Sequence, residues 1–251
     1  MQIHLISAFP SMFEGPLSES MMQRARDRRI VDIHIHDLRE FTDDKHRSVD
    51  DYPYGGGPGM ILKPEPIVRG IERIKEQCGE TPARVILMSP PGETFTQAKA
   101  NQFAQEPVLI FICGHYKGTD ERVRELLGAD EISIGDYVLT GGELPAMVVI
   151  DAVVRLLPGV LGDLDSAIGD SFQSELLDHP HYTRPEDFRG YRVPEVLLSG
   201  HHEKIRRWRE MKSRERTAAR KPKATPLKNQ SSKRAVPTAS GGDTTGENNN
   251  E

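Results

Sequence analysis

The chain has 251 residues, of which 36% are hydrophobic and 28% charged, and its formal net charge is −5. These values fit one large domain, or one domain with a small addition, together with some unstructured chain. No apolar run is long enough to span a bilayer and no signal peptide is recognisable, so we expect a cytoplasmic protein without a membrane partner. Cys78 and Cys113 lie far apart outside any Cys-x-x-Cys pair, which indicates free thiols.

Apolar segments alternate with amphipathic segments along the first 160 residues. Continuous apolar runs predict strands at 3–7, 30–36, 84–88, 108–113 and 131–134. Helix-like spacing of apolar residues predicts helices at 18–29, 61–77, 96–105 and 145–157. Buried strands that alternate with helices indicate an α/β fold, with a mainly parallel sheet covered on both faces.

The composition changes three times after residue 160. Residues 161–170 are rich in Gly, Asp and Ser and are predicted to form a flexible linker. Residues 171–222 contain a basic helix near 203–216 and form a second, small helical domain. Residues 223–251 are rich in Lys, Pro, Ser and Thr and then in Gly and Asn, a composition that predicts disorder.

The charge is distributed unevenly along the chain. Residues 201–235 contain thirteen Lys and Arg against three Glu, whereas the first 200 residues are acidic. A basic arm on an acidic body fits a partner that carries phosphate groups. A solvated basic tail without a partner explains the charge equally well.

Three loops that contain Gly and Pro follow predicted strands, at 89–92, 114–118 and 135–145. Ligands of open α/β sheets bind beyond the carboxyl ends of the strands, where glycines let the backbone approach a ligand closely. Each loop alone is explained as an ordinary turn, and the three together favour a site for a flat heteroaromatic ligand. The glycine-rich segment 54–60 lacks the spacing of a phosphate-binding loop and is interpreted as a flexible loop near a site.

Several polar residues invite a functional role that the residues alone do not establish. Arg155 lies four residues after Asp151, so an ion pair within the helix is the simplest interpretation. Asp170 begins a pattern typical of a helix N-cap. The histidine pairs 34/36, 179/181 and 201/202 lie on segments that nothing brings together, so we predict no dedicated metal site.

A series of long motifs gives these features a common origin. They are Ser7-x-Phe9-Pro10, the segment 49–60, Cys113-Gly114-x-Tyr116-x-Gly118, the segment 133–147, Asp170-Ser171-Phe172, His181-Tyr182-Thr183-Arg184-Pro185 and the segment 196–202. In this order they resemble the bacterial tRNA (guanine-N1)-methyltransferase family of the SPOUT superfamily, from residue 1 to about residue 222. The resemblance implies a SPOUT catalytic domain at 1–160 with a deep trefoil knot, which composition and periodicity do not reveal. It also implies a tRNA-binding domain at 171–222 and a homodimer with sites at its interface.

The resemblance also implies the ligands and the residues that hold them. S-adenosylmethionine would be the methyl donor, and the anticodon stem-loop of tRNA would be the partner. The residues implied in cofactor binding are Ser89, Pro90, Gly114, Tyr116, Ile134, Gly135, Asp136, Tyr137, Val138, Leu139, Gly141, Gly142 and Pro145. The residues implied in tRNA binding are Asp50, Tyr54, Gly55, Gly59, Ser199, His202 and Arg209.

The family chemistry implies a role for two further residues. The methyl group goes to N1 of guanine 37, just 3′ of the anticodon, and this nitrogen carries a proton at neutral pH. Asp170 corresponds to the general base that takes the proton, and Arg155 to the cation that stabilises charge developing at O6. The resemblance further implies dependence on Mg²⁺ and a linker at 161–170 that becomes ordered when tRNA binds.

The chain departs from the family pattern at several positions. His115 and Lys117 stand where the family usually has Arg and Glu, Tyr52 replaces a common Arg, and Gly169 replaces a usual Glu. The family's final helix is missing after residue 222, which predicts a shortened C-terminal domain. Two alternatives therefore stay open: a SPOUT methyltransferase with another RNA target, and a catalytically impaired RNA-binding homologue.

Overall fold

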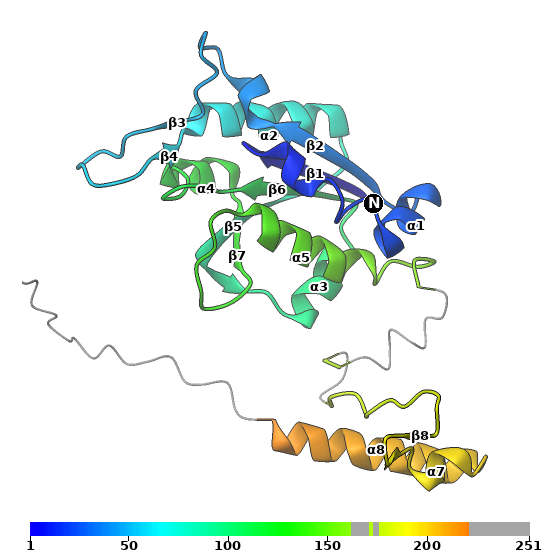
Figure 1. Cartoon of the computed structure of the whole chain (residues 1–251). Coiled ribbons are helices and arrows are strands. Elements are labelled where there is room, and N and C mark those ends of the chain that lie inside the picture. The colour runs from blue at the N-terminus through cyan, green and yellow to red at the C-terminus, as the bar shows by residue number, and fades with distance from the viewer. Residues whose placement is uncertain (162–170, 173–175, 221–251) are drawn as a thin grey trace, which may run out of the picture.

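The structure is a computed structural model that describes residues 1–161, 171–172 and 176–220. Its first part is an α/β fold around a five-stranded sheet (Figure 1). The strands stand in the order β2 (Asp32–Asp37), β1 (Gln2–Ser7), β6 (Val108–Cys113), β5 (Ala83–Thr94) and β7 (Asp130–Ser133). Every neighbouring pair in this sheet is parallel, which confirms the predicted sheet.

The sequence of β6 explains its place at the centre of the sheet. All six residues of this strand, Val-Leu-Ile-Phe-Ile-Cys, are buried. Alternate side chains of a strand point to opposite faces. Leu109 and Phe111 pack in one apolar cluster, and Ile110 and Ile112 pack in another. The sheet is therefore buried on both faces, as a parallel sheet requires.

Helices supply the two outer layers. The cluster that contains Phe111 includes buried side chains of α1 (Ser20–Asp27), α3 (Gln97–Phe103) and α5 (Glu143–Val154). The cluster that contains Ile110 includes side chains of α2 (Pro64–Cys78) and α4 (Glu121–Leu127). Figure 1 shows α2 on one side of the sheet and α3 and α5 on the other. Two short 3-10 helices, η1 (Pro10–Phe13) and η2 (Leu38–Phe41), follow β1 and β2.

Three of the differences between the observed and the predicted elements concern β5, α2 and α4. Strand β5 continues to Thr94 because its register shifts: Met88 and Glu93 both pair with Ile132. The predicted helix at 61–77 begins only at Pro64, because residues 61–62 form β4 (Ile61–Leu62), which pairs with β3 (Asp50–Asp51). Helix α4 was not predicted, because Val123 is the one side chain of this short polar segment that is buried.

The second part of the described chain contains a short hairpin and two helices. The hairpin joins β8 (Asp187–Phe188) and β9 (Tyr191–Arg192), and α7 (Glu195–Leu198) and α8 (His202–Ala219) follow. Helix α8 includes the predicted basic helix, whereas the hairpin and α7 were not predicted. The hydroxyl oxygen of Thr217 accepts a hydrogen bond from the backbone of Leu177 at 2.8 Å, which ties α8 to the segment before the hairpin.

Some predictions fall outside the described residues. These are the flexible linker apart from residue 161, Asp170 and Gly169, and the disordered tail at 223–251. Within the described ranges, no helix is long and apolar enough to cross a membrane.

Candidate active site

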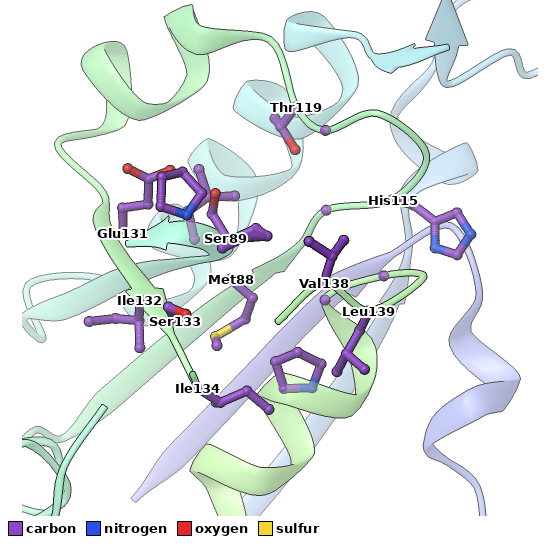
Figure 2. A pocket seen from close by; sticks show the side chains of 18 of the residues that line it. Met88, Ser89, His115, Thr119, Glu131, Ile132, Ser133, Ile134, Val138 and Leu139 are labelled. Carbon is purple, nitrogen blue, oxygen red and sulfur yellow. The ribbon is translucent and has the colours of Figure 1, made fainter. Parts of the chain in front are cut away.

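A cavity of about 440 Å³ lies beyond the carboxyl ends of β6 and β7 and beside residues 87–91 of β5. Its walls include this part of β5, the loops that follow β6 and β7, and Pro145 at the start of α5. Figure 2 shows the side chains of Met88, Ile132 and Leu139 around this space. The volume falls in the range of about 300–1,000 Å³ that is usual for sites of small molecules and cofactors.

The fold brings together almost all the residues expected to bind S-adenosylmethionine. Asp136 is the one residue of that set that does not line the cavity. The twelve that do are Ser89, Pro90, Gly114, Tyr116, Ile134, Gly135, Tyr137, Val138, Leu139, Gly141, Gly142 and Pro145.

Close contact between two loops shapes one wall of this cavity. The backbone N–H of Gly142 donates a hydrogen bond to the carbonyl of Gly114 at 2.7 Å, and His115 pairs with Gly141 in an antiparallel bridge. A Cβ atom at Gly142 would lie 2.8 Å from the backbone nitrogen of Gly114 and 2.9 Å from Cα of Cys113. Such distances are shorter than real Cβ contacts, so only glycine fits at position 142.

The opposite wall is shaped by the register shift in β5. Strand β5 stops pairing with β7 after Met88 and pairs with it again from Glu93. A Cβ atom at Gly92 would lie 2.5 Å from the backbone of Glu131, so this glycine allows the chain to return close to β7. The segment between these two pairings contributes Ser89, Pro90 and Pro91 to the cavity.

Two of the residues expected to bind tRNA lie near the edge of the cavity. The backbone of Tyr116 has a φ of +60°. Burial of the ring, and then the negative charge of Asp50, raise the pKa of the Tyr116 hydroxyl. Asp50 is therefore close to a residue of the cavity wall. Gly59 packs against Lys117, since a Cβ atom there would lie 2.8 Å from the lysine Cγ.

The other residues expected to bind tRNA are spread over the chain. Tyr54 is fully exposed in the glycine-rich loop, next to Gly55. Ser199 and His202 lie at the end of α7 and the start of α8. Arg209 lies on α8 and lines a second cavity of about 550 Å³, together with Tyr182, Arg184 and Trp208. Asp50 and Gly59 thus approach Tyr116 and Lys117, which line the first cavity, whereas Arg209 lines the second.

A buried carboxylate lies close to His115, a residue of the cavity wall. Glu143, at the N-terminus of α5, is 0% exposed, and its Oε1 accepts a hydrogen bond from the hydroxyl of Ser7 at 2.6 Å. Its Oε2 lies 3.5 Å from Nδ1 of His115. Neither Glu143 nor Ser7 was expected to have a role, although both belong to recognised motifs. An acidic residue at the start of a largely apolar helix was the signal that could have found it.

Of the two residues expected to act in catalysis, the structure describes Arg155 and not Asp170. Arg155 follows α5 directly, and its backbone N–H donates to the carbonyl of Asp151 at 3.3 Å. This backbone bond fits the helical context assumed for the pair. Asp170 lies outside the described residues, so its distance from Arg155 is not defined.

Two groups of histidines lie in contact, although nothing in the sequence indicated that separate segments would come together. The rings of His34 and His36 both stack on His4, with centroids 4.7 and 5.3 Å away. The pairing of strands β1 and β2 brings them together, and pairing is not visible in a single strand. Asp178, His179 and His181 also gather, with possible ligand atoms within 4.8 Å of one another.

Asp178, His179 and His181 form hydrogen bonds within their own segment. The imidazole of His181 lies 2.7 Å from Asp178, and Nδ1 of His179 lies 3.2 Å from the carbonyl of Pro180. Burial acts to raise the pKa of Asp178, but the hydrogen bonds from the His181 side chain and the His179 backbone, with the electrostatic effect of both rings, lower it overall. Both cysteines are free thiols, as predicted.

Comparison with known proteins assigns the chain to a family. The sequence profile of the tRNA (guanine-1)-methyltransferase TrmD family matches residues 1–226. The chain belongs to this family. The resemblance found in the motifs is thereby confirmed.

Relatives named tRNA (guanine-N(1)-)-methyltransferase are similar over nearly their whole length. The protein of Geobacillus kaustophilus is 56% identical over 222 residues, which cover 88% of this chain and 90% of the relative. The protein of Anoxybacillus flavithermus is 58% identical with the same coverage. The protein of Bacillus subtilis is 56% identical, and the match covers 88% of this chain and 91% of the relative.

Proposed function

We propose that this chain transfers a methyl group from S-adenosylmethionine to N1 of guanine 37 in tRNA, the nucleotide 3′ of the anticodon. Family membership makes it a tRNA (guanine-N1)-methyltransferase. The observation that carries the finer proposal is the convergence of three segments on one cavity, lined by twelve of the thirteen residues at the family's cofactor positions.

The cavity suits a ligand with a flat heteroaromatic group. Leu87, Met88, Ile132 and Val138 provide apolar walls, and the glycine positions allow backbone groups to approach a ligand closely. S-adenosylmethionine would supply an activated methyl group on a sulfonium. The protein's part is to hold the methyl donor and the guanine in the correct orientation.

The target nitrogen must lose its proton before it can attack the methyl group. We assign this step to Asp170, whose carboxylate accepts the N1 proton, on the strength of the motif Asp170-Ser171-Phe172. Negative charge then develops toward O6, and we assign its stabilisation to Arg155. Arg155 follows the C-terminal end of α5, whereas Pro145 at the other end of this helix lines the cavity, so the assignment rests on the correspondence of Arg155 with the family position.

We further propose that the active protein is a homodimer with the trefoil-knotted catalytic domain of the SPOUT superfamily at residues 1–160. Large apolar side chains beside the cavity support the dimer, and the knot rests on the family resemblance. Val138 is 80% exposed in the single chain, and Leu144 and Val148 project from α5 with about half of their surface exposed. Exposed apolar groups of this kind mark surfaces that bind other molecules.

Residues 171–222 would grip the anticodon stem-loop after the linker at 161–170. Helix α8 supports this role, because arginines 206, 207, 209, 214 and 216 are all on this one helix. Contacts between arginines and phosphates position an RNA without specifying its sequence. Recognition of guanine 37 therefore has to come from the catalytic domain and Asp170.

Lys117 does not fit the metal site implied by the family. An ammonium group cannot ligate Mg²⁺, which prefers oxygen ligands, and Lys117 stands where the family usually has Glu. We therefore derive no catalytic step through magnesium at this position.

The proposal is tested by transfer of labelled methyl groups to tRNA transcripts. Transcripts with guanine or adenine at position 37 are compared, with the wild-type enzyme and with Asp170→Ala. We expect transfer that requires guanine 37 and is lost in the variant, while calorimetry gives unchanged affinity for S-adenosylmethionine. Transfer that ignores nucleotide 37 would assign another RNA target. Absence of transfer by a wild-type protein that binds the methyl donor would indicate an impaired RNA-binding homologue.

A further inference from the structure

Glu143 is a charged side chain in an unfavourable place. It is completely buried, and one of its oxygens is satisfied by the hydroxyl of Ser7. Among the described residues, its other oxygen, Oε2, is buried without a hydrogen-bond partner. A buried carboxylate with an unpaired oxygen strongly destabilises a fold unless a donor is supplied.

The imidazole of His115 is placed to supply this donor. Its Nδ1 lies 3.5 Å from Oε2 of Glu143, and within the described part of the chain it is also buried without a hydrogen-bond partner. Two buried atoms in the same condition therefore face each other. A proton on Nδ1 satisfies both of them, because the ring nitrogen then donates to the carboxylate.

The surroundings of the pair leave the ring little freedom. The ring of Phe9 packs against His115 with centroids 4.3 Å apart, and the ring of Tyr116 meets it edge-on at 4.8 Å. Cys113 also faces the carboxylate, since the charge of Glu143 adds to burial in raising the pKa of that thiol. Figure 2 shows the His115 ring turned away from Met88 at the middle of the cavity.

The pair closes over the backbone that forms the cavity wall. His115 pairs with Gly141 in the antiparallel bridge, and Gly141 lies between the two side chains, so that an added Cβ atom would collide with both. Glu143 comes two residues later, at the first turn of α5. A hydrogen bond between Glu143 and His115 therefore fixes the loop before α5 against the loop after β6.

We propose that His115 donates its Nδ1 proton to Glu143 and is thereby a positioning residue for the cofactor loops. The inference rests on the proposed function, because it assigns the cavity to S-adenosylmethionine. The pair does not contact the reacting atoms. It keeps the two loops at the distance that the cofactor needs, so its loss weakens cofactor binding and leaves the chemical step nearly unchanged.

Two variants of His115 separate hydrogen bonding from ring shape. His115→Phe keeps a ring but removes the donor, and His115→Arg keeps a donor, as the family usually does. We expect Phe to weaken the affinity for S-adenosylmethionine roughly tenfold or more, the size of effect expected for one unsatisfied buried group, and Arg to stay within about threefold of wild type. The kcat at saturating cofactor should change little in either variant. His46→Gln, in an exposed loop, is the matched control.

A double-mutant cycle tests whether the two side chains act on each other. In a Glu143→Gln background the buried charge is gone, so His115→Phe should weaken binding far less than it does in the wild type. Equal losses in both backgrounds would overturn the proposal, as would an Arg variant that binds as poorly as the Phe variant.

The position of the proton can be measured without any variant that threatens folding. Nitrogen-15 NMR of the wild-type protein distinguishes a protonated from an unprotonated ring nitrogen, and the His115 signal is assigned with His115→Arg. We expect a proton on Nδ1 in the free protein. An unprotonated Nδ1 would refute the proposed hydrogen bond to Glu143 whether or not the chain binds S-adenosylmethionine. Failure of the wild type to bind the cofactor would instead refute the proposed function.

Discussion

The histidine cluster of strands β1 and β2 predicts that the fold is sensitive to acid. His4 is 4% exposed, and burial, followed by the charges of His34 and His36, lowers its pKa from 6.5 to about 4. Burial also lowers the pKa of His36. His4 and His36 therefore stay neutral to lower pH in the folded protein, whereas in the unfolded chain they take up a proton near pH 6.5.

The direction and size of the effect follow from this difference. Because the pKa of His4 is lower in the folded state, its contribution to stability is complete above about pH 7 and is lost as the pH falls toward 4. The total is about 3 kcal/mol, of which about 2 kcal/mol is lost between pH 7.5 and pH 5. A loss of this size is a large share of the stability of most domains.

Urea unfolding followed by circular dichroism measures the effect. His4→Gln cannot take up a proton at this position, so its free energy of unfolding should fall by about 2 kcal/mol less than that of wild type between pH 7.5 and pH 5. Both proteins are compared at one concentration, because assembly adds to apparent stability. His46→Gln should follow the wild type. Parallel pH profiles for wild type and His4→Gln would refute the reasoning.

Three further outcomes are expected from other parts of the molecule. Gly142→Ala should abolish measurable binding of S-adenosylmethionine in calorimetry and destabilise the fold by about 1–3 kcal/mol, because its Cβ would lie 2.8 Å from a backbone nitrogen; unchanged affinity would show that the two loops can separate. Arg84→Ala should cost about 1 kcal/mol in urea unfolding, because it removes a cation shared by two carboxylates, whereas Arg122→Ala, at an exposed pair, should cost almost nothing; equal losses would contradict this difference. Iodoacetamide should modify Cys78 before Cys113, since complete burial raises the pKa of the Cys113 thiol well above its usual value; mass spectrometry that finds Cys113 modified first in the native protein would be incompatible with its burial.

The parts of the fold that could be predicted are those in which local pattern and tertiary packing agree. Strand β6 was predicted with its observed bounds, because its continuous apolar run has no other place than the centre of a sheet. The extension of β5 to Thr94 could not be predicted. Pro90, Pro91 and Gly92 signal a turn locally, and the strand resumes only because β7 offers Ile132 for pairing a second time.

In the candidate site too, features that follow from local sequence could be predicted, and features that depend on contacts between distant segments could not. The residues expected to bind the cofactor carry recognisable motifs, and twelve of them lie around one cavity, so their proximity could be predicted from the sequence. The burial of Glu143 has a sequence signal, its place at the start of a largely apolar helix, but its approach to His115 depends on the packing of two distant loops. The approach of His4 to His34 and of Asp50 to Tyr116 likewise depends on pairing between distant segments.

The strand order imposes a sequence of events on the growing chain. Strand β1 pairs with β2 on one side and with β6 on the other, so that Gln2 finds its second partner only at Val108. Contacts over such a separation form slowly, and the edges of a parallel sheet stay exposed until they do. During synthesis, the first strand must therefore remain incompletely paired until residues 108–113 have left the ribosome. The centre of this sheet is completed late, and a chain interrupted before β6 cannot form it.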